Sequence, residues 1–360
     1  MIEHFILAAL AFISFLFAVD KNKFRSGIFI SSALFFLLAY ILVTFRAENV
    51  GNDTGAYIDY FRTCLQFDDY QSFMDFGASR FEKGYATYSY LISRITDDYT
   101  VFFAICNALY LGATIYFFRK NLFNKNVWIL PWFLSSMYYD LFNTLRASMA
   151  MVFIYLFAVS FLKGNRVKSI FFYILSFLMH TSALATGVIF FLKSKYVSKL
   201  LAHEIALLVI FGCIGIFFSQ FMSLLPDYYS NYYFESQYGQ GGTRIASIAD
   251  LIMLSSLYIL SYHKSIESWE EHDFFKIMFL FAIGLSFLGL FLPSFNRVEF
   301  FFKPFMIVYV LNIFKYQAKW RQYLIIAVFC ILAIYQVVAF IVRPEWLGIF
   351  PYSFTCNPCI

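Results

Sequence analysis

Apolar stretches long enough to cross a membrane recur along this chain at short intervals, and they leave it few possible folds. A helix of about 20 apolar residues crosses the roughly 30 Å hydrocarbon core of a bilayer. The composition agrees, because 61% of the residues are hydrophobic and 14% are charged, against about 45 to 50% and about 25% in soluble domains. Lipid must therefore surround most of the chain, and the sequence predicts an all-α, polytopic membrane protein.

About ten segments have the length and hydropathy of a full transmembrane helix. They lie at residues 5–19, 27–45, 99–118, 127–143, 146–162, 203–225, 244–262, 274–292, 298–314 and 322–342. The segment 170–192 is also apolar, but a polar His-Thr-Ser tripeptide at residues 180–182 interrupts it. We expect a single integral membrane domain over residues 1–360, without a soluble domain attached to it.

The charges around the first span predict its orientation. Glu3 precedes this span and the basic segment 21–25 follows it, which is opposite to the charge pattern of a signal peptide. Because positively charged loops stay in the cytoplasm, the N-terminus is expected outside. The short basic loops 119–125 and 163–168 then fall inside, and the large loop 46–98, with nine acidic and five basic residues, falls outside.

The segment 170–192 does not fit a single crossing. The basic residues of 193–199 and 315–321 would then both lie outside, against the charge rule. A re-entrant segment or short helical hairpin, broken at residues 180–182, keeps both groups inside, and we expect this arrangement. The loop 263–273 is the exception, because it is acidic although this topology places it in the cytoplasm.

The two predicted faces differ in the kind of cation they carry. The inner face has 13 Lys and 4 Arg, and the outer face has 2 Lys and 8 Arg. Arginine binds phosphate through a planar, bidentate fork, whereas lysine is a hydrated point charge. The outer arginines are therefore candidates for phosphate recognition. For any one of them, pairing with an acid of the outer loop or with a lipid headgroup is the alternative.

The outer loops have recognisable features of their own. Loop 46–98 is too long to lack structure, and its residues 82–95 carry apolar side chains at helical spacing, so we expect a helix along the membrane interface. A second outer loop, 226–243, is rich in tyrosine. Cys356 and Cys359 form a lone CxxC near the end of the chain, which has too few ligands for zinc and could at best form a small disulfide.

Motifs for nucleotide or metal-dependent hydrolysis are absent. The chain contains no P-loop, dinucleotide-binding glycine motif, HExxH or GxSxG. Ionisable residues at outer helix ends or at membrane depth are functional candidates instead. They are Arg146 with Asp140 and Asn143 before it, His180, Arg244 with Asp250, and Arg297 with Glu299. The alternative for each is an interfacial anchor, or a buried pair such as Arg297 with Glu299.

Short segments of this chain, in their order, resemble the EpsG-like branch of the Wzy-type polysaccharide polymerases, a group that makes O-antigen, capsule or exopolysaccharide. The most specific part of the resemblance runs from Arg146 to His180. The segments are Gly51-Asn52-Asp53-Thr54 with Tyr57, Glu82-Lys83-Gly84-Tyr85, Leu145-Arg146-Ala147-Ser148-Met149-Ala150, Phe177-Leu178-Met179-His180-Thr181-Ser182-Ala183-Leu184, Asn296-Arg297 and Pro351-Tyr352.

The resemblance implies an enzyme of the bacterial cytoplasmic membrane, the inner membrane, that works on its outer face. Such a glycosyltransferase moves a growing polysaccharide from undecaprenyl pyrophosphate to the non-reducing end of a lipid-linked repeat unit. Its expected partners are that lipid-linked oligosaccharide and membrane lipid, with a flippase and a chain-length regulator as further possibilities. Nucleic acid is not an expected partner.

This chemistry assigns roles to particular residues. A cation cluster must hold the pyrophosphate, and the chosen arginines are Arg146, Arg244 and Arg297. A base must accept the proton of the attacking sugar hydroxyl, and Asp53 and His180 are alternatives, with Glu82 as a third. Tyrosine rings can hold sugars, and the candidates are Tyr228, Tyr229, Tyr232, Tyr233 and Tyr238. We expect no metal ion or other cofactor, because fixed arginines can supply the positive charge.

Two other functions fit parts of the sequence. A lipid-linked glycan transporter or flippase would line a pathway with polar residues, but the chain shows no internal repeat, and its 53-residue outer loop suits a carrier poorly. Another glycosyl or acyl transferase with a lipid-linked donor would use a similar site. Only a polymerase would produce a ladder of products from purified lipid-linked repeat units.

Overall fold

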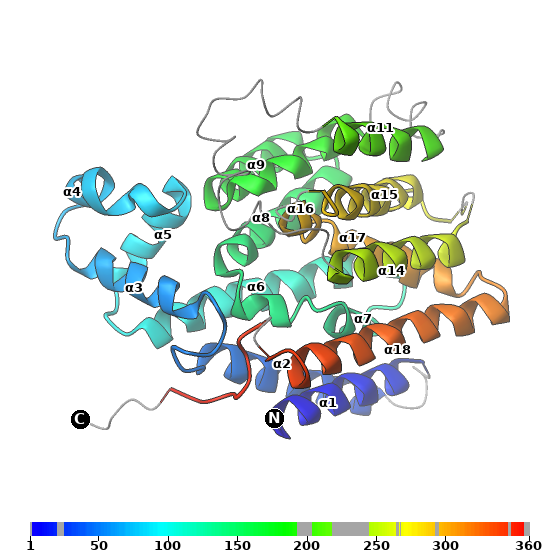
Figure 1. Ribbon diagram of the computed structural model, residues 1–360, viewed down its shortest axis with the longest axis horizontal. Helices are drawn as coiled ribbons and strands as arrows, with labels where there is room; N and C mark the ends of the chain where they lie inside the picture. Colours follow the sequence, from blue (N-terminus) through cyan, green and yellow to red (C-terminus); the bar gives the residue numbers. More distant parts are fainter. Residues whose placement is uncertain are drawn as a thin grey trace. The chain divides into compact units, whose positions relative to one another are not determined.

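The computed structural model describes residues 2–19, 25–192, 204–217, 245–263, 266, 268–291, 295–344 and 347–355, and these residues form helices joined by turns (Figure 1). They group into two compact units. The first unit comprises Met1–Leu184 and Phe329–Ile360, and the second comprises Ala185–Val328. The prediction of an all-helical fold is confirmed for the described residues.

The first unit begins with α1 (Ile2–Val19) and α2 (Arg25–Thr44), and after the second unit it resumes at Phe329 within α18 (Lys319–Ile341) and continues to Ile360. The helices between them are α3 (Thr54–Leu65), α4 (Tyr70–Ser72), η1 (Phe73–Gly77), η2 (Ala78–Arg80), α5 (Lys83–Ser93), α6 (Tyr99–Asn121), α7 (Ile129–Leu134), η3 (Tyr139–Phe142), α8 (Leu145–Leu162), α9 (Arg166–Met179) and η4 (Thr181–Phe191), which runs on into the second unit. Among the described helices, α2, α6 and α8 are long and apolar enough to cross a membrane. The chain is thus a membrane protein, and the number of about ten spans stays a prediction.

The expectation of one continuous span at 127–143 is wrong. Helix α7 ends at Leu134, the chain turns at Ser136 with a φ of 64°, and η3 follows. The side-chain amide of Gln336, on α18, donates to the backbone oxygens of Phe133 (2.9 Å) and Leu134 (2.7 Å). These carbonyls are satisfied without a continuing helix, so the backbone can turn inside an apolar stretch.

The expected span 298–314 is also divided. Helix α16 (Phe295–Glu299) ends before a short turn, and α17 (Lys303–Phe314) begins after it. Pro304 stands in the first turn of α17, where its missing N–H costs no helical hydrogen bond. A proline at this position therefore favours a new helix start over a continuous helix.

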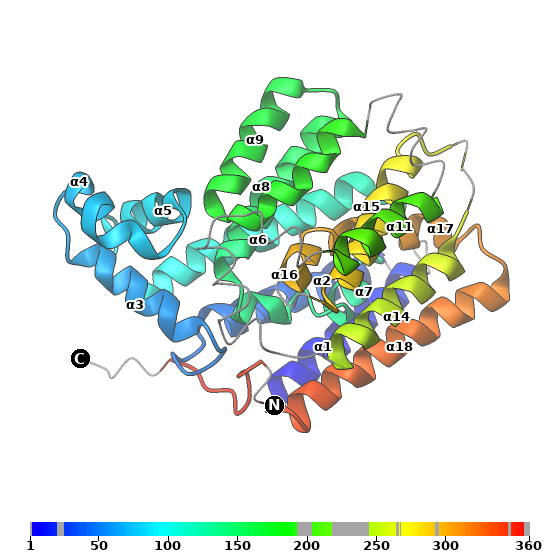
Figure 2. The same cartoon turned by 45° about the horizontal axis from the view of Figure 1, so that its top comes forward.

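Helices α8 and α9 form an antiparallel hairpin and run side by side in both views (Figures 1 and 2). Gly164, with a φ of +76°, makes the turn between them, and Asn165 caps α9 by accepting a hydrogen bond from the Lys168 N–H (3.1 Å). The break predicted at residues 180–182 is present, because His180 is extended and the 3-10 helix η4 follows it. Residues 193–199, on which the predicted topology depends, lie outside the described residues.

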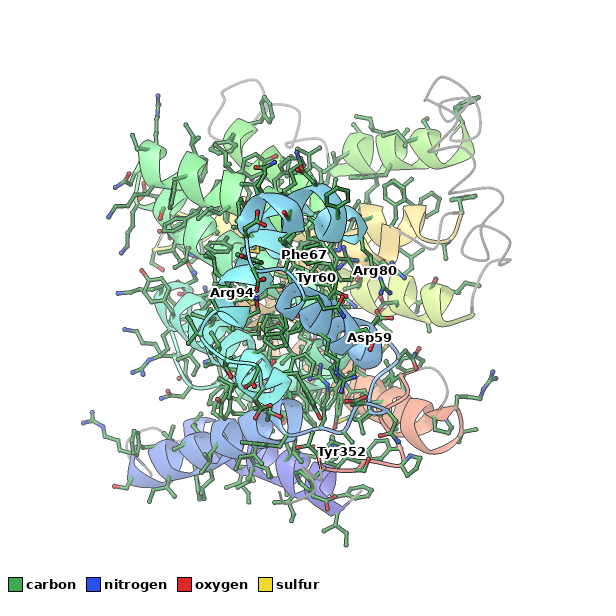
Figure 3. All side chains as sticks on the ribbon, turned by 90° about the vertical axis from the view of Figure 1, so that its left-hand side faces the viewer. Asp59, Tyr60, Phe67, Arg80, Arg94 and Tyr352 are labelled. Carbon is green, nitrogen blue, oxygen red and sulfur yellow. The ribbon has the colours of Figure 1, made fainter. Side chains whose placement is uncertain are left out.

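Loop 46–98 forms a small helical layer from α3 to α5, as its length predicted. Its helices are held together by aromatic rings, such as Tyr60 against Phe81 with centroids 4.5 Å apart. Arg94, after α5, donates from Nη2 to the backbone oxygen of Cys64 on α3 (2.9 Å). Figure 3 shows Tyr60 and Arg94 on this layer. The expected helix at 82–95 is α5, and it packs on both α3 and α9.

The second unit is built around α15 (His272–Leu288). This helix packs against α11 (Glu204–Ile216), α14 (Ile245–Ser261), α16 and α17. Its Lys276 forms an ion pair with Glu204 of α11, and Glu204 also accepts a hydrogen bond from the Tyr258 hydroxyl (2.7 Å). The largely buried charges of Lys276 and Glu204 are thus paired with each other, as low-dielectric surroundings require.

Candidate functional site

The carboxylate of Glu82 joins three segments of the first unit that are far apart in the sequence. Its Oε2 lies 2.6 Å from Nη1 of Arg146, at the start of α8. Its Oε1 accepts a hydrogen bond from the Thr181 N–H (3.1 Å) and lies 3.7 Å from Nδ1 of His180. The side chains of Glu82, Arg146 and His180 are 17%, 24% and 17% exposed, so the group is largely enclosed and still accessible.

Glycine at position 84 brings Glu82 to this place. Glu82 immediately precedes α5, and a Cβ built on Gly84 would lie 2.6 Å from both the Cβ and the backbone oxygen of Leu178. Only a residue without a side chain lets the first turn of α5 touch the end of α9 so closely. Because His180 and Thr181 directly follow this end of α9, the close approach sets Glu82 beside them.

Arg146 is oriented by an aromatic ring and by its helix. It is the second residue of α8, and its guanidinium carbon lies 4.3 Å from the centre of the Phe81 ring. Such a cation–π contact is worth about 2 kcal/mol or more when it is shielded from water. Phe81 and Glu82 are neighbours, so one short segment provides both the ring and the carboxylate that hold the guanidinium.

His180 is held as a neutral ring. Its backbone N–H donates to the Ser176 oxygen at the end of α9 (3.0 Å), and its Nδ1 accepts a hydrogen bond from the Ser182 N–H (3.2 Å). A nitrogen that accepts from a backbone N–H carries no proton, which assigns the ring proton to Nε2. The neutral ring can therefore donate a hydrogen bond from Nε2, whereas its Nδ1 is already engaged.

The charge state of Glu82 follows from its surroundings. Burial alone would raise the pKa of this carboxyl, but the positive charge of Arg146 and the hydrogen bond from the Thr181 N–H outweigh the effect, and the pKa lies below its ordinary value of 4.5. Glu82 is therefore ionised at neutral pH and neutralises Arg146. An anion that binds Arg146 must compete with this carboxylate.

Asp53 is linked to this group through Tyr57, which interacts with both Asp53 and Arg146. It is exposed and precedes α3, where its side chain makes no capping hydrogen bond. Burial raises the pKa of the Tyr57 hydroxyl, and the charges of Arg146 and Asp53 act on it in opposite directions. Tyr57 thus lies close enough to interact with both residues. Tyr57 belongs to the Gly51–Tyr57 segment on which the family resemblance partly rests, but no role was predicted for it.

Two other arginines of the first unit, Arg46 and Arg62, differ from Arg146. Arg46 is fully buried and donates to the Thr54 hydroxyl (2.9 Å), so it is inaccessible to a ligand. Arg62 pairs with Glu48 (2.5 Å), as the alternative of pairing within the loop predicted. Arg146 therefore stands out as a partly accessible arginine that stacks on a ring beside a histidine.

Other predicted site residues belong elsewhere. Arg297 is exposed on α16 of the second unit. There, the buried Glu299 has its Oε1 3.4 Å from Nζ of Lys303, which also lies 3.4 Å from Asp250. Several predicted residues lie outside the described residues, namely Arg244, Tyr228, Tyr229, Tyr232, Tyr233 and Tyr238.

The side chains of Arg146, Glu82 and His180, which the first unit brings together, can each contribute to a group-transfer reaction. A guanidinium can hold a phosphate group, a carboxylate can accept a proton, and a neutral imidazole can donate a hydrogen bond. All three side chains lie at or next to the start of a helix (α5, α8 or η4), where backbone N–H groups such as that of Thr181 add positive potential. An anionic substrate with a transferable group is the kind of ligand that such a set can serve.

Comparison with known proteins gives one match. No curated protein and no solved structure matches the chain. The sequence model of the EpsG family matches residues 29–354, a range that contains Asp53, Glu82, Arg146, His180 and the tail up to Phe354. Because this match covers nearly the whole chain, the protein belongs to the EpsG family.

Proposed function

We propose that this protein is a polysaccharide polymerase of the bacterial cytoplasmic membrane. It transfers a growing glycan from undecaprenyl pyrophosphate to the non-reducing end of a lipid-linked repeat unit on the outer face. Membership of the EpsG family supports a membrane glycosyltransferase in general terms. The observation that carries the proposal further is the contact of Glu82 with Arg146, Thr181 and, more distantly, His180.

In this proposal, Arg146 binds the pyrophosphate of the donor. Its Nη1 is held by Glu82, and its Nε is buried without a hydrogen-bond partner among the described residues. A phosphate that reaches the guanidinium gains a charge-assisted contact and displaces Glu82 from it. The positive charge then stabilises the pyrophosphate as it leaves the sugar.

Glu82 is the proposed base. The hydroxyl oxygen of the acceptor sugar attacks the anomeric carbon, the bond from that carbon to the pyrophosphate oxygen breaks, and the hydroxyl proton passes to the carboxylate. Separation from Arg146 raises the proton affinity of Glu82, because the nearby positive charge had lowered its pKa. Donor binding thus creates the base. His180 donates from Nε2 to the departing oxygen in this scheme, and Asp53 remains the alternative base.

Reconstitution tests this proposal. The purified protein in proteoliposomes, supplied with lipid-linked repeat units, should yield a ladder of glycans that differ by one repeat. A single added sugar or acyl group would instead indicate a different lipid-linked transferase. Movement of the unchanged substrate across the bilayer would indicate a transporter. The two latter outcomes both contradict the proposal.

A further inference from the structure

Three distant segments of the first unit meet at the side chain of Asn143. Its Oδ1 accepts a hydrogen bond from the backbone N–H of Asn52 (2.6 Å), in the loop between α2 and α3. Its Nδ2 donates to the backbone oxygen of Leu347 (3.0 Å), in the C-terminal tail. One amide therefore connects residues that are 91 and 204 positions away from it.

The two segments bound by Asn143 also bind each other. The Gly51 N–H donates to the Gly348 oxygen (2.7 Å). Farther along, the Ala47 N–H donates to the Ser353 oxygen (2.9 Å), and the Thr355 N–H donates to the Phe45 oxygen (2.8 Å). The tail thus runs antiparallel to the loop, and Figure 3 shows Tyr352 on this tail.

Two glycines make this meeting point possible. Gly51 has a φ of +91°, and a Cβ on it would lie 2.5 Å from the backbone oxygen of Phe142. Gly348 has a φ of +62°, and a Cβ on it would overlap Oδ1 of Asn52. Both positions need a left-handed backbone and a close approach, which glycine alone provides without strain. The meeting of the three segments therefore depends on Gly51, Asn143 and Gly348, one residue from each segment.

The hydrogen bonds of Asn143 connect the start of α8, which carries Arg146, to the helical layer that carries Glu82. Asn143 is three residues before Arg146, at the entrance to α8. Asn52 is two residues before α3, whose Tyr57 and Tyr60 both pack their rings against Tyr85 of α5, with centroids 6.2 Å apart. Helix α5 in turn follows Glu82. The start of α8 and the layer that holds Glu82 are thus joined at Asn143.

We infer that Asn143 is a positioning residue for the Glu82–Arg146 pair, and that the C-terminal tail acts through it. The effect of Asn143 on polymerisation rests on the proposed function. Its effect on the geometry of the pair does not, so the two can fail separately. A carboxylate and a guanidinium in contact at 2.6 Å lose the hydrogen bond of their ion pair when one helix shifts by about 1 Å.

Hydrogen exchange measured by mass spectrometry on the full-length protein tests the geometry without any substrate. The reporter is the peptide that contains Thr181, whose N–H donates to Glu82. Asn143→Ala removes two hydrogen bonds, and we expect exchange in this peptide to rise about tenfold. Asn121→Ala is the matched control, because it removes the side-chain hydrogen bond to the Phe117 oxygen at the far end of α6 and should leave the peptide unchanged.

The variant Gly348→Ala is a second, independent test of the inference, because it pushes the tail away from Asn52 and leaves the Asn143 side chain unchanged. It should raise exchange in the same peptide. Asn143→Asp keeps the acceptor for the Asn52 N–H and should cause a smaller rise than Asn143→Ala, so it also serves if the alanine variant does not fold. If faster exchange in these variants is confined to residues 45–54 and 347–355, Asn143 does not position the pair and the inference is wrong.

A double-mutant cycle on the polymerisation rate separates positioning from general stability. If Asn143 acts through the pair, Asn143→Ala should lower the rate roughly tenfold in the native protein and have little further effect in an Arg146→Lys background, where the pair is already perturbed and product still forms. Equal fold-losses in both backgrounds would show that Asn143 supports the fold alone. A protein that never polymerises, but shows the expected exchange, would contradict the proposed function and leave the positioning role supported.

Discussion

Substitution of alanine for Gly84 perturbs the site through one added methyl group. The new Cβ would lie 2.6 Å from the Cβ and oxygen of Leu178, where ordinary contacts between such atoms are 3.4–4 Å. The C-terminal end of α9 offers backbone atoms here, which cannot turn aside as a flexible side chain would. Helix α5 must therefore move away from α9 by about 1 Å.

The magnitude of the effect follows from the bonds of Glu82. A shift of about 1 Å lengthens the bond from the Thr181 N–H, now 3.1 Å, beyond hydrogen-bonding distance. A hydrogen bond to a charged group contributes about 1.5 to 3 kcal/mol. If this contact positions the base, the polymerisation rate of Gly84→Ala should fall by roughly 10- to 150-fold.

A matched glycine controls for the effect of alanine on a helix. Gly112, within α6, has open space around its Cβ position, so Gly112→Ala should keep the native rate and raise the free energy of unfolding by about 0.5 to 1 kcal/mol. Initial rates of ladder formation in proteoliposomes, with thermal unfolding in detergent beside them, compare the two variants. A native rate for Gly84→Ala would refute the role given to the close approach of α5 and α9.

Three more predictions concern charge and topology. Arg146→Lys keeps the charge but loses the planar fork, so the rate should fall by about 30- to 1000-fold, or about 2 to 4 kcal/mol, and a near-native rate at equal protein level would remove Arg146 from the site. The folded pKa of Glu82 is lowered, so its contribution to stability is present above the ordinary value of 4.5 and is lost as pH falls below it. The melting temperature should therefore fall more steeply below this pH in the native protein than in Glu82→Gln, and parallel curves would contradict the ion pair. Finally, cysteines introduced at Ser198 and at the exposed Lys319 should resist a membrane-impermeant thiol reagent in intact cells, and labelling of both from outside would invert the predicted topology of the second half.

Local sequence patterns predicted the helices that depend on nearby residues. The polar tripeptide at 180–182 correctly marked the break after α9, and the spacing of apolar residues predicted α5. The same patterns failed at 127–143, because the turn there is stabilised by Gln336, about 200 residues away. Hydropathy reports the solvent around a segment, and it carries no information about such a distant donor.

In the candidate site, too, the sequence indicated individual residues but not the contacts between distant ones. The sequence indicated Arg146 and His180 as ionisable residues beside apolar helices, and it indicated Glu82 separately, through the resemblance to a polymerase family. Glu82 was only the third choice among the possible bases, because Glu82 and Arg146 are 64 positions apart and the sequence does not reveal their contact. The neutral state of His180 depends on the hydrogen bond from Ser182, which only the extended backbone at residue 180 allows.

The most direct test of the proposed mechanism compares Glu82→Gln with Asp53→Asn in the same reconstituted assay. Both substitutions keep the shape of the side chain and remove a base. The contact between Glu82 and Arg146 predicts that Glu82→Gln abolishes the ladder of products, whereas Asp53→Asn, whose native side chain is exposed, retains most of the rate. A full ladder from Glu82→Gln would contradict the mechanism, and its loss in Asp53→Asn alone would make Asp53 the base.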